Sequence, residues 1–253
     1  MSDWNSKQYK RFEKERTQPS VDLISRIDIN PKSVLDIGCG PGNSTNRLYE
    51  HFPSAEILGI DSSENMLETA RESYPQLKFE KCFVPDGLEN FNKFDLIFSN
   101  ACLHWIPNHT ELLPKLVQRL NDGGVLAVQM PLVQTAMFYK MLNDLISHGR
   151  WEKLKVIQNF HNLMPDDTYD ILAQCSKSVE MWETTYYHIV PSHIAVIEWY
   201  KGSGLRPYLE MLGSDEREKF ISDLLKMIEE NYPVQMDGNV ILQMPRLFFV
   251  AKK

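Results

Sequence analysis

Asp36 and three glycines stand at the end of the first apolar run in the chain. Residues 34–37 predict a short buried strand, and Asn43 begins a predicted helix that runs to about His51. The turn between them holds glycine at alternate positions, Gly38, Gly40 and Gly42. Glycine tolerates positive φ and lets a ligand approach the backbone, and a helix N-terminus presents free amides at the carboxyl edge of a parallel sheet. The stretch is therefore either a ligand-binding turn or an ordinary tight turn.

A second acid favours the first of these alternatives. Residues 55–60 form a second apolar run, which ends at Asp61. An acid at the tip of the second strand of a βαβ unit is placed to accept hydrogen bonds from both hydroxyls of a ribose. The glycine turn and Asp61 together predict a nucleoside-containing ligand.

The glycine spacing narrows the choice of nucleoside. A dinucleotide-binding turn has the pattern G-x-G-x-x-G, whereas this chain has G-x-G-x-G after an acid that suits an amine. The stretch resembles motif I of the class I S-adenosylmethionine-dependent methyltransferases. The resemblance implies that Asp36 lies near the methionine amino group, that the glycines pass under the methionine and the ribose, and that Asp61 holds the ribose. The implied cofactor is S-adenosylmethionine.

The same resemblance implies further contacts with the cofactor. Arg16, in the N-terminal region, is a candidate for binding the methionine carboxylate, with a solvated surface charge as the alternative. Ser62, a candidate for contact with the cofactor, begins the predicted helix 62–74. Met66 is a candidate for packing on the adenine, with core packing as the alternative. Asn100, after the fourth predicted strand, is expected near the methionine.

The third predicted strand, 77–84, departs from the family pattern. The family usually places an acid at the end of this strand to accept a hydrogen bond from the adenine amino group, but here Lys81, Cys82 and Phe83 occupy that place. Asp86, a few residues later, is the candidate replacement, with backbone groups as the alternative.

His104 and Trp105 follow the fourth predicted strand, 94–99. The carboxyl end of this strand brings the next loop beside the ligand in a fold of this type. The two rings are therefore expected to face the region where the methyl group leaves, and His104 is the one candidate for a catalytic role. A structural pair of histidine and tryptophan is the alternative.

The composition excludes several classes of function. The chain has 253 residues and a formal net charge of −7, which argues against binding to a phosphate backbone. Its 4 cysteines stand far apart, with no histidine at ligand spacing, so neither a metal site nor a disulfide framework is expected. No apolar run approaches the roughly 20 residues that cross a bilayer. We therefore expect a cytoplasmic protein without nucleic-acid, membrane or metal partners.

Apolar runs and amphipathic segments alternate in a way that predicts one α/β domain over residues 1–253. The resemblance implies a class I methyltransferase fold, whose core is a Rossmann-like, seven-stranded, mostly parallel sheet with an antiparallel last strand. An N-terminal cover, 1–30, is expected to hold two helices, with Pro19 near the start of the second. Helical insertions at 132–164 and 191–232 are expected to form a lid over the acceptor site. The other expected elements are strands 125–130, 179–189 and 240–251, helices 110–120, 166–175, 192–201 and 215–231, and turns at 121–124 and 202–207.

Short motifs extend the similarity over nearly the whole chain. They are Asp3-Trp4-Asn5, Gly59-Ile60-Asp61-Ser62-Ser63, Val128-Gln129-Met130-Pro131, Thr184-Thr185-Tyr186-Tyr187-His188, Gly204-Leu205-Arg206-Pro207 and Pro245-Arg246-Leu247-Phe248. Together they resemble the bacterial trans-aconitate 2-methyltransferases, least closely at 81–93 and 132–164. That family converts a carboxylate of trans-aconitate, or of a related small polycarboxylate, into a monomethyl ester, with S-adenosylhomocysteine as the second product.

The implied reaction suggests which residues bind the acceptor. The sulfonium and the attacking carboxylate neutralise each other in the transition state, so a strong cation on the reacting oxygen would favour the ground state. Arginines should therefore bind the carboxylates that do not react, because a planar guanidinium suits bidentate binding. The candidates are Arg206 and Arg246, with surface ion pairs as the alternative. A polar and aromatic lid is expected from Tyr187, His188, His193 and Trp199.

Two other functions stay open. The segment 132–164 could reshape the acceptor pocket, which would make the chain a methyltransferase for another small carboxylic acid. The altered third strand is compatible with a non-catalytic protein that binds S-adenosylmethionine. We expect a small-molecule polycarboxylate as the substrate, and a monomer or a weak homodimer.

Overall fold

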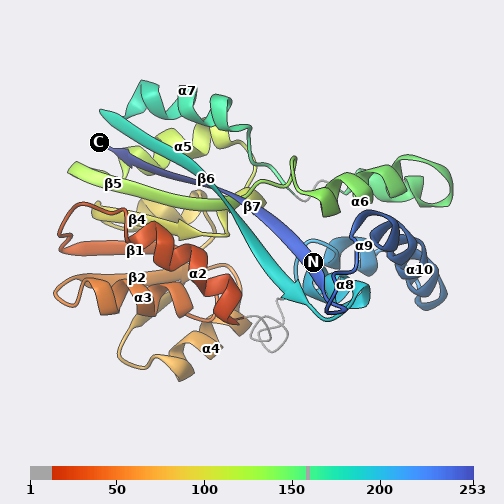
Figure 1. Cartoon of the computed structure of the whole chain (residues 1–253). Coiled ribbons are helices and arrows are strands. Elements are labelled where there is room, and N and C mark those ends of the chain that lie inside the picture. Colours follow the sequence, from red (N-terminus) through yellow and green to blue (C-terminus); the bar gives the residue numbers. More distant parts are fainter. Residues whose placement is uncertain (1–12, 158–159) are drawn as a thin grey trace. The chain divides into compact units, whose positions relative to one another are not determined.

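The computed structural model describes residues 13–157 and 160–253 (Figure 1). It contains a seven-stranded sheet with the order β3-β2-β1-β4-β5-β7-β6. β1 pairs in parallel with β2 and β4, β2 with β3, and β4 with β5, and the last strands are antiparallel. The predicted fold class is therefore confirmed. The strands are β1 (Ser33–Ile37), β2 (Glu56–Asp61), β3 (Lys78–Lys81), β4 (Phe94–Asn100), β5 (Leu120–Pro131), β6 (Ser178–Val190) and β7 (Val240–Lys252).

Helices connect the parallel strands, as the predicted alternation requires. The six helices predicted at 43–51, 62–74, 110–120, 166–175, 192–201 and 215–231 all form, with ends that differ by a few residues at most. The helices are α2 (Glu13–Ile24), α3 (Asn43–His51), α4 (Glu64–Ser73), α5 (His109–Gln118), α6 (Met137–Ser147), α7 (Pro165–Cys175), α8 (His193–Lys201), α9 (Arg206–Glu210) and α10 (Ser214–Asn231), with 3-10 helices η1 (Asp86–Asn90), η2 (Leu103–Trp105) and η3 (Gly149–Val156).

The chain forms two compact units. The first, which we call the sheet unit, comprises the described residues 13–131, 160–184 and 247–253. The second, which we call the helical unit, comprises residues 132–157 and 185–246 and contains α6, α8, α9 and α10. The helical unit therefore takes in most of the two predicted insertions, and their role as a lid stays a prediction.

The core of the sheet unit explains why its strands are apolar on consecutive residues. Leu96, Ile97 and Phe98 of β4 are all fully buried, as is Ser99 after them. Side chains alternate between the two faces of a strand, so four buried residues in a row mean that both faces are covered. Figure 1 shows α2 beside α3, and α2 also packs against β5, whereas α5 packs against α7 and β5.

The N-terminal region differs from the prediction. α2 is one helix that continues through Pro19, so no second helix begins there. Proline usually marks the first turn of a helix because it lacks an N–H group. Here the buried side chains of Leu23 and Ile24 lie beyond it, and tertiary packing stabilises most helices in proteins. The first predicted helix falls in residues 1–12, which lie outside the described residues.

The predicted turn at 121–124 is wrong, because these residues belong to β5. The register between β4 and β5 shifts between Phe94 and Leu96, and Gly123 has a φ of 75°. An irregularity of this kind bends a strand without ending it. The Asn-Asp-Gly-Gly sequence therefore marks a bulge.

Two other predicted boundaries are also wrong. β3 ends at Lys81 rather than at residue 84, since Pro85 follows and cannot donate a backbone hydrogen bond to a neighbouring strand. Arg206 is the first residue of α9 rather than part of a turn. Pro207 comes directly after it, where the first turn of a helix accepts proline.

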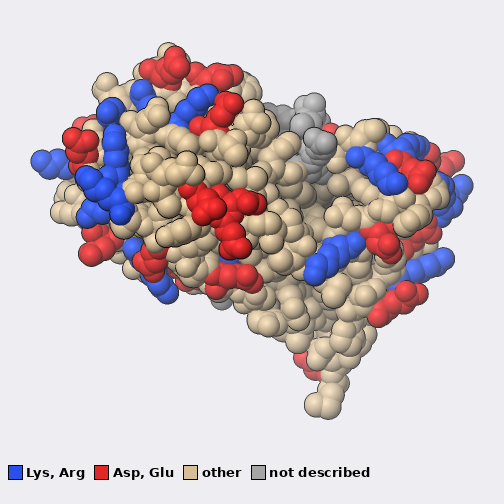
Figure 2. Space-filling view, turned by 90° about the horizontal axis from the view of Figure 1, so that it is seen from above, with Lys and Arg blue, Asp and Glu red and all other residues tan. Residues whose placement is uncertain are grey.

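Surface charges of both signs are interspersed on the face that Figure 2 shows, and no continuous basic stripe crosses the residues described there. None of the described helices is long and apolar enough to span a membrane. Within the same residues, no group of three or more His, Cys, Asp or Glu side chains is arranged to hold a metal ion.

Candidate active site

The glycine turn after β1 has the backbone conformation that the sequence predicts. Gly38, Gly40 and Gly42 have φ values of 73°, 53° and 91°. The N–H groups of Gly38 and Cys39 donate to the carbonyl oxygen of Ile60 at 2.8 and 3.0 Å, which ties the turn to β2. The turn is therefore fixed between two strands before any ligand binds.

Gly38 and Gly40 serve different purposes in this turn. A Cβ atom built on Gly38 would lie 2.3 Å from both Cβ and Sγ of Cys102, so the side chain of this residue is excluded by the loop after β4. A Cβ atom on Gly40 would meet nothing within 4 Å. Gly38 therefore allows the protein to close around the turn, whereas Gly40 leaves its backbone open to close approach by a ligand.

Asp61 lies beside the turn, as predicted. Its Oδ2 accepts from the N–H of Gly40 at 3.0 Å, and its Oδ1 accepts from the N–H of Ser63 at 2.9 Å. A carboxylate has about four lone-pair sites, so it can orient the turn and also accept from a hydroxyl. The geometry fits the ribose contact that the family resemblance implies.

Asp36 is a fully buried acid, and one of its two carboxylate oxygens, Oδ2, accepts hydrogen bonds from side chains. Its Oδ2 accepts from Ser44 Oγ and Thr45 Oγ1 of α3, both at 2.7 Å. Within the described part of the chain, no group hydrogen-bonds to its Oδ1. Burial raises the pKa of Asp36 to about 6, an effect that the two hydroxyls oppose and the charge of Asp61 increases. Such a carboxylate is suited to a cationic ligand, as the predicted contact with an ammonium group requires.

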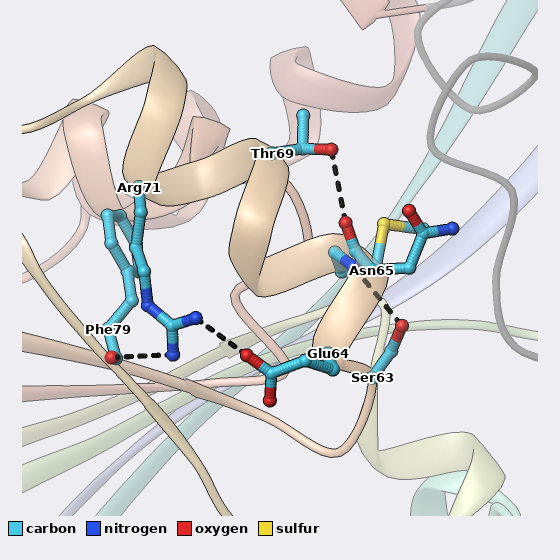
Figure 3. A network of polar contacts seen from close by, with 7 residues as sticks. Ser63, Glu64, Asn65, Thr69, Arg71 and Phe79 are labelled. Atoms are coloured by element: carbon cyan, nitrogen blue, oxygen red, sulfur yellow. Dashed lines mark hydrogen bonds and ion pairs between the residues drawn. The ribbon is translucent and has the colours of Figure 1, made fainter.

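Figure 3 shows the polar contacts at the start of α4, including that of Ser63. Ser63 is the N-cap, and its Oγ accepts from the N–H of Met66 at 3.2 Å, while Ser62 is exposed. Arg71 binds Glu64 at 2.7 Å and the carbonyl oxygen of Phe79 at 3.3 Å, which joins α4 to β3. Ser62 therefore lies in the turn after Asp61, where its predicted cofactor contact stays a prediction.

The two predicted adenine contacts have different environments. Met66 is buried on α4, in the same helix face as Leu67 and Ala70. Asp86 is exposed at the first residue of η1. Burial of Met66 agrees with core packing, and both adenine contacts stay predictions.

The loop after β4 places Asn100 and the aromatic residues. Asn100 is the last residue of β4, and its Oδ1 is buried without a hydrogen-bond partner in the described structure. Ala101 then takes a φ of 53°, and its N–H donates to Gln129 O at 2.9 Å. Burial raises the pKa of the next residue, Cys102, far above that of an ordinary thiol, so this cysteine is a packing residue rather than a nucleophile.

His104 and Trp105 form an aromatic cluster with Phe160, a residue that belongs to none of the sequence motifs. The His104 ring lies 5.0 Å from Trp105 and 5.6 Å from Phe160, and Trp105 lies 4.9 Å from Phe160. The N–H of His161 donates to His104 O at 2.9 Å, so segment 160–161 lies against η2. His104 is buried, which agrees with a structural pair, and its catalytic role stays a prediction.

The remaining predicted substrate residues belong to the helical unit. The ring of His188 stacks on Trp199 at 4.6 Å. Tyr187 is exposed and, one position earlier on β6, has its side chain on the opposite face of the strand. His193 Nε2 hydrogen-bonds to Tyr232 O at 2.7 Å. The structure therefore joins His188 with Trp199 but separates Tyr187 from that pair.

Both predicted arginines are shielded from solvent in the helical unit. Arg206, on α9, lies 3.6 Å from Glu210, and its side chain is 17% exposed. Arg246, on β7, is buried, and its charge counteracts the rise that burial causes in the pKa of Tyr200. Tyr200 in turn stacks on Phe138 at 3.5 Å. The unit thus holds two shielded guanidinium groups, of which that of Arg246 lies near Tyr200, and a shielded guanidinium binds a carboxylate strongly.

Comparisons of the sequence agree with this site. A family model described as a methyltransferase domain matches residues 30–202. Trans-aconitate 2-methyltransferase from Escherichia coli O139:H28 is 42% identical over 260 residues, which cover 100% of this chain and 99% of that protein. The trans-aconitate 2-methyltransferase of Shigella flexneri is 41% identical with the same coverage. The similarity therefore extends through both units.

Solved structures share the fold at lower sequence identity. The YcgJ protein from Bacillus subtilis superposes with a TM-score of 0.61 and 14% identity, over 93% of this chain and 98% of that chain. A second structure is phosphoethanolamine N-methyltransferase 2 from Haemonchus contortus, solved with phosphomonomethylethanolamine and S-adenosylhomocysteine. Its TM-score is 0.57 and its sequence identity is 17%, over 93% of this chain and 52% of that chain. These two structures support the fold alone.

Because burial raises the pKa of Asp36, we predict that its ionised carboxylate destabilises the folded protein. Between pH 3.8 and about pH 6, the carboxyl of Asp36 holds more protons in the native state than in the unfolded state. The free energy of unfolding therefore falls as the pH rises through this window. Asp36→Asn keeps an acceptor for the two hydroxyls and removes the charge. It should raise the free energy of unfolding by up to about 3 kcal/mol at pH 8, with no gain below pH 4, as measured by urea denaturation.

Asp237→Asn is a control of opposite sign. Hydrogen bonds from Asn239 lower the pKa of this exposed carboxyl, so its removal should not stabilise the protein at pH 8. A gain for Asp36→Asn that is equal at pH 4 and pH 8, or a loss at pH 8, would contradict a buried and ionised Asp36.

Proposed function

Because the chain belongs to the trans-aconitate 2-methyltransferase family, we propose that it transfers the methyl group of S-adenosylmethionine to a carboxylate of trans-aconitate. The products are a monomethyl ester and S-adenosylhomocysteine. The observation that carries the proposal is the buried carboxylate of Asp36, which has one unoccupied oxygen beside the glycine turn. Similarity over the full length to relatives named for this reaction supports the choice of acceptor.

The reaction needs positioning more than acid–base catalysis. Bound S-adenosylmethionine would supply an electrophilic methyl group to a carboxylate oxygen of the acceptor, and S-adenosylhomocysteine would be the leaving group. A carboxylate with a pKa near 4 is already ionised at pH 7, so no residue has to remove a proton. Alignment of the reacting atoms can supply roughly 7–11 kcal/mol of the barrier reduction. We therefore propose no catalytic acid or base and assign His104 a packing role in place of a catalytic one.

The sheet unit provides the groups for the cofactor. Asp36 would bind the methionine ammonium, and Asp61 would accept from the ribose hydroxyls. Arg16, half-buried on α2, would bind the methionine carboxylate. Gly40 would let the cofactor approach the backbone, and Asn100 would lie beside the methionine.

The aromatic cluster of His104, Trp105 and Phe160 would exclude water from the methyl group. Its rings lie in the loop after β4 and in the segment that packs on it. Exclusion of water strengthens the electrostatic interactions of the reacting groups and protects the sulfonium.

The helical unit provides cations for a polycarboxylate. Arg206 and Arg246 would bind the carboxylates that are not methylated, because a guanidinium on the reacting oxygen would stabilise the ground state. His188 and Trp199 would contribute a stacked polar and aromatic surface. Tyr187, exposed on the other face of β6, would contact substrate only from that face.

We further propose that the enzyme works in the cytoplasm as a monomer or a weak homodimer, without a metal or nucleic acid. The net charge of −7 supports the absence of a nucleic-acid partner. An acceptor that is already ionised needs no metal to activate it.

Transfer of labelled methyl groups tests the proposal. The protein is incubated with methyl-labelled S-adenosylmethionine and separately with trans-aconitate, cis-aconitate, citrate, isocitrate and a fatty acid. Base-labile label should appear with trans-aconitate at the highest kcat/KM. Transfer mainly to another acid would support a different carboxyl methyltransferase, and transfer to none would support a non-catalytic binder.

Arg206→Ala tests the acceptor site. KM for trans-aconitate should rise roughly tenfold to a hundredfold, as expected for the loss of a hydrogen bond between charged groups. The Kd for S-adenosylhomocysteine should not change. Arg150→Ala is the matched control, because Arg150 forms an exposed ion pair with Asp223 in the same unit. An unchanged KM in Arg206→Ala would overturn the assignment.

A further inference from the structure

Three polar side chains lie in a row on one face of the sheet. In the register of the parallel strands, Asp36 of β1 pairs with Phe98 of β4, and Phe98 pairs with Ala127 of β5. Asn100 pairs with Gln129 two residues further along. Paired residues of neighbouring strands point to the same face, and residues two apart on one strand share a face. Asp36, Asn100 and Gln129 therefore point to the same side.

That side of the sheet carries α3 and α2. Ser44 and Thr45 of α3 hydrogen-bond to Asp36, which fixes the face to which the row points. α2 packs against both α3 and β5, so the helix that contains Arg16 covers the same face. The row therefore runs under the helix that is predicted to reach the amino-acid end of the cofactor.

Gln129 is the unusual member of the row. Its side chain is fully buried, and neither Nε2 nor Oε1 has a hydrogen-bond partner in the described structure. Buried amides in proteins are nearly always paired, because an unpaired one destabilises the fold. The Oδ1 atoms of Asn100 and Asp36 are likewise buried without a partner among the described residues. The Gln129 amide and these two oxygens therefore leave one donor group and several acceptors without hydrogen-bond partners along this row of the sheet.

We propose that Gln129 is a cofactor-binding residue whose Nε2 donates a hydrogen bond to the α-carboxylate of the methionine part of S-adenosylmethionine. The amino-acid end of this molecule carries an ammonium and a carboxylate on one carbon. The acceptors of Asp36 and Asn100 match the ammonium. Gln129, one strand spacing of about 4.8 Å beyond Asn100, supplies the donor on the side away from Asp36. A carboxylate has two oxygens, so Gln129 and Arg16 can bind it together.

The inference rests on the proposed function only for the identity of the cofactor. It makes no use of the acceptor. Its test is therefore a binding measurement, which gives a result even if no carboxylate is ever methylated.

The Gln129→Leu variant tests binding of the amino-acid end of the cofactor separately from binding of its nucleoside. Calorimetry is performed with S-adenosylhomocysteine and with 5′-methylthioadenosine, which has the same nucleoside but lacks the ammonium and the carboxylate. The Kd for S-adenosylhomocysteine should rise roughly tenfold to a hundredfold, and the Kd for 5′-methylthioadenosine should stay the same. The melting temperature of the free protein should stay the same or rise, because an unpaired amide is removed.

Thr168→Val is the matched control. Thr168 is also fully buried in the sheet unit, but its hydroxyl has a partner, the carbonyl oxygen of Met164 at 2.9 Å. This variant should bind both ligands normally, and its melting temperature should not rise.

Gln129→Glu gives a second, independent reading. A negative charge at this position would repel the methionine carboxylate, so affinity for S-adenosylhomocysteine should fall in the order wild type, Gln129→Leu, Gln129→Glu. Equal losses for both ligands would mean that Gln129 only maintains the structure and would overturn the proposal. A normal Kd for S-adenosylhomocysteine would also overturn it, and a raised KM for the acceptor would then assign Gln129 to the substrate.

Discussion

A charged carboxylate held inside the protein is the constraint on which the rest of the structure depends. Asp36 is buried at the end of β1, and burial raises its pKa although two hydroxyls donate to it. The glycine turn, the first turn of α3 and the loop after β4 all close around this group, and Gly38 is needed because Cys102 occupies the space of a side chain. A buried acid with an unoccupied oxygen weakens a fold unless a cation binds to it. The fold therefore maintains Asp36 at the expense of its own stability, which is typical of a binding group.

The same constraint separates the binding of the methyl donor from the choice of acceptor. The groups that suit an amino acid joined to a nucleoside, Asp36, Asp61 and the row that ends at Gln129, all belong to the sheet unit. The shielded guanidinium groups that suit a polycarboxylate belong to the helical unit. Methyl transfer to a carboxylate changes charge but moves no proton, so the two sets of groups can act by electrostatics and position alone. Related chains could then change their acceptor through the helical unit while the sheet unit stays constant.

The sequence was sufficient to predict the glycine turn after β1 and the acid at the end of the next strand. The three glycines predict positive φ, and Asp61 is predicted beside them because consecutive parallel strands end at one edge of a sheet. Residues that meet through the register or through long loops gave no such signal. Gln129 becomes notable only when its strand is aligned with Asn100, and Phe160 only when segment 160–161 packs on η2. The wrong predictions have the same origin. Gly123 is typical of a turn, but the pairing of β5 with β4 keeps it in a strand. Pro19 is typical of a helix start, but packing of the residues after it stabilises one continuous helix.

Proton release on binding tests the central claim most directly. If Asp36 receives the methionine ammonium, it must lose its proton when the cofactor binds. Calorimetry of S-adenosylhomocysteine binding at pH 6, in buffers that differ in ionisation enthalpy, should then show release of about half a proton per site. The release should be absent in Asp36→Asn and should disappear for the wild type at pH 8. A binding enthalpy that does not depend on the buffer at pH 6 would contradict the assignment of Asp36 to the ammonium group.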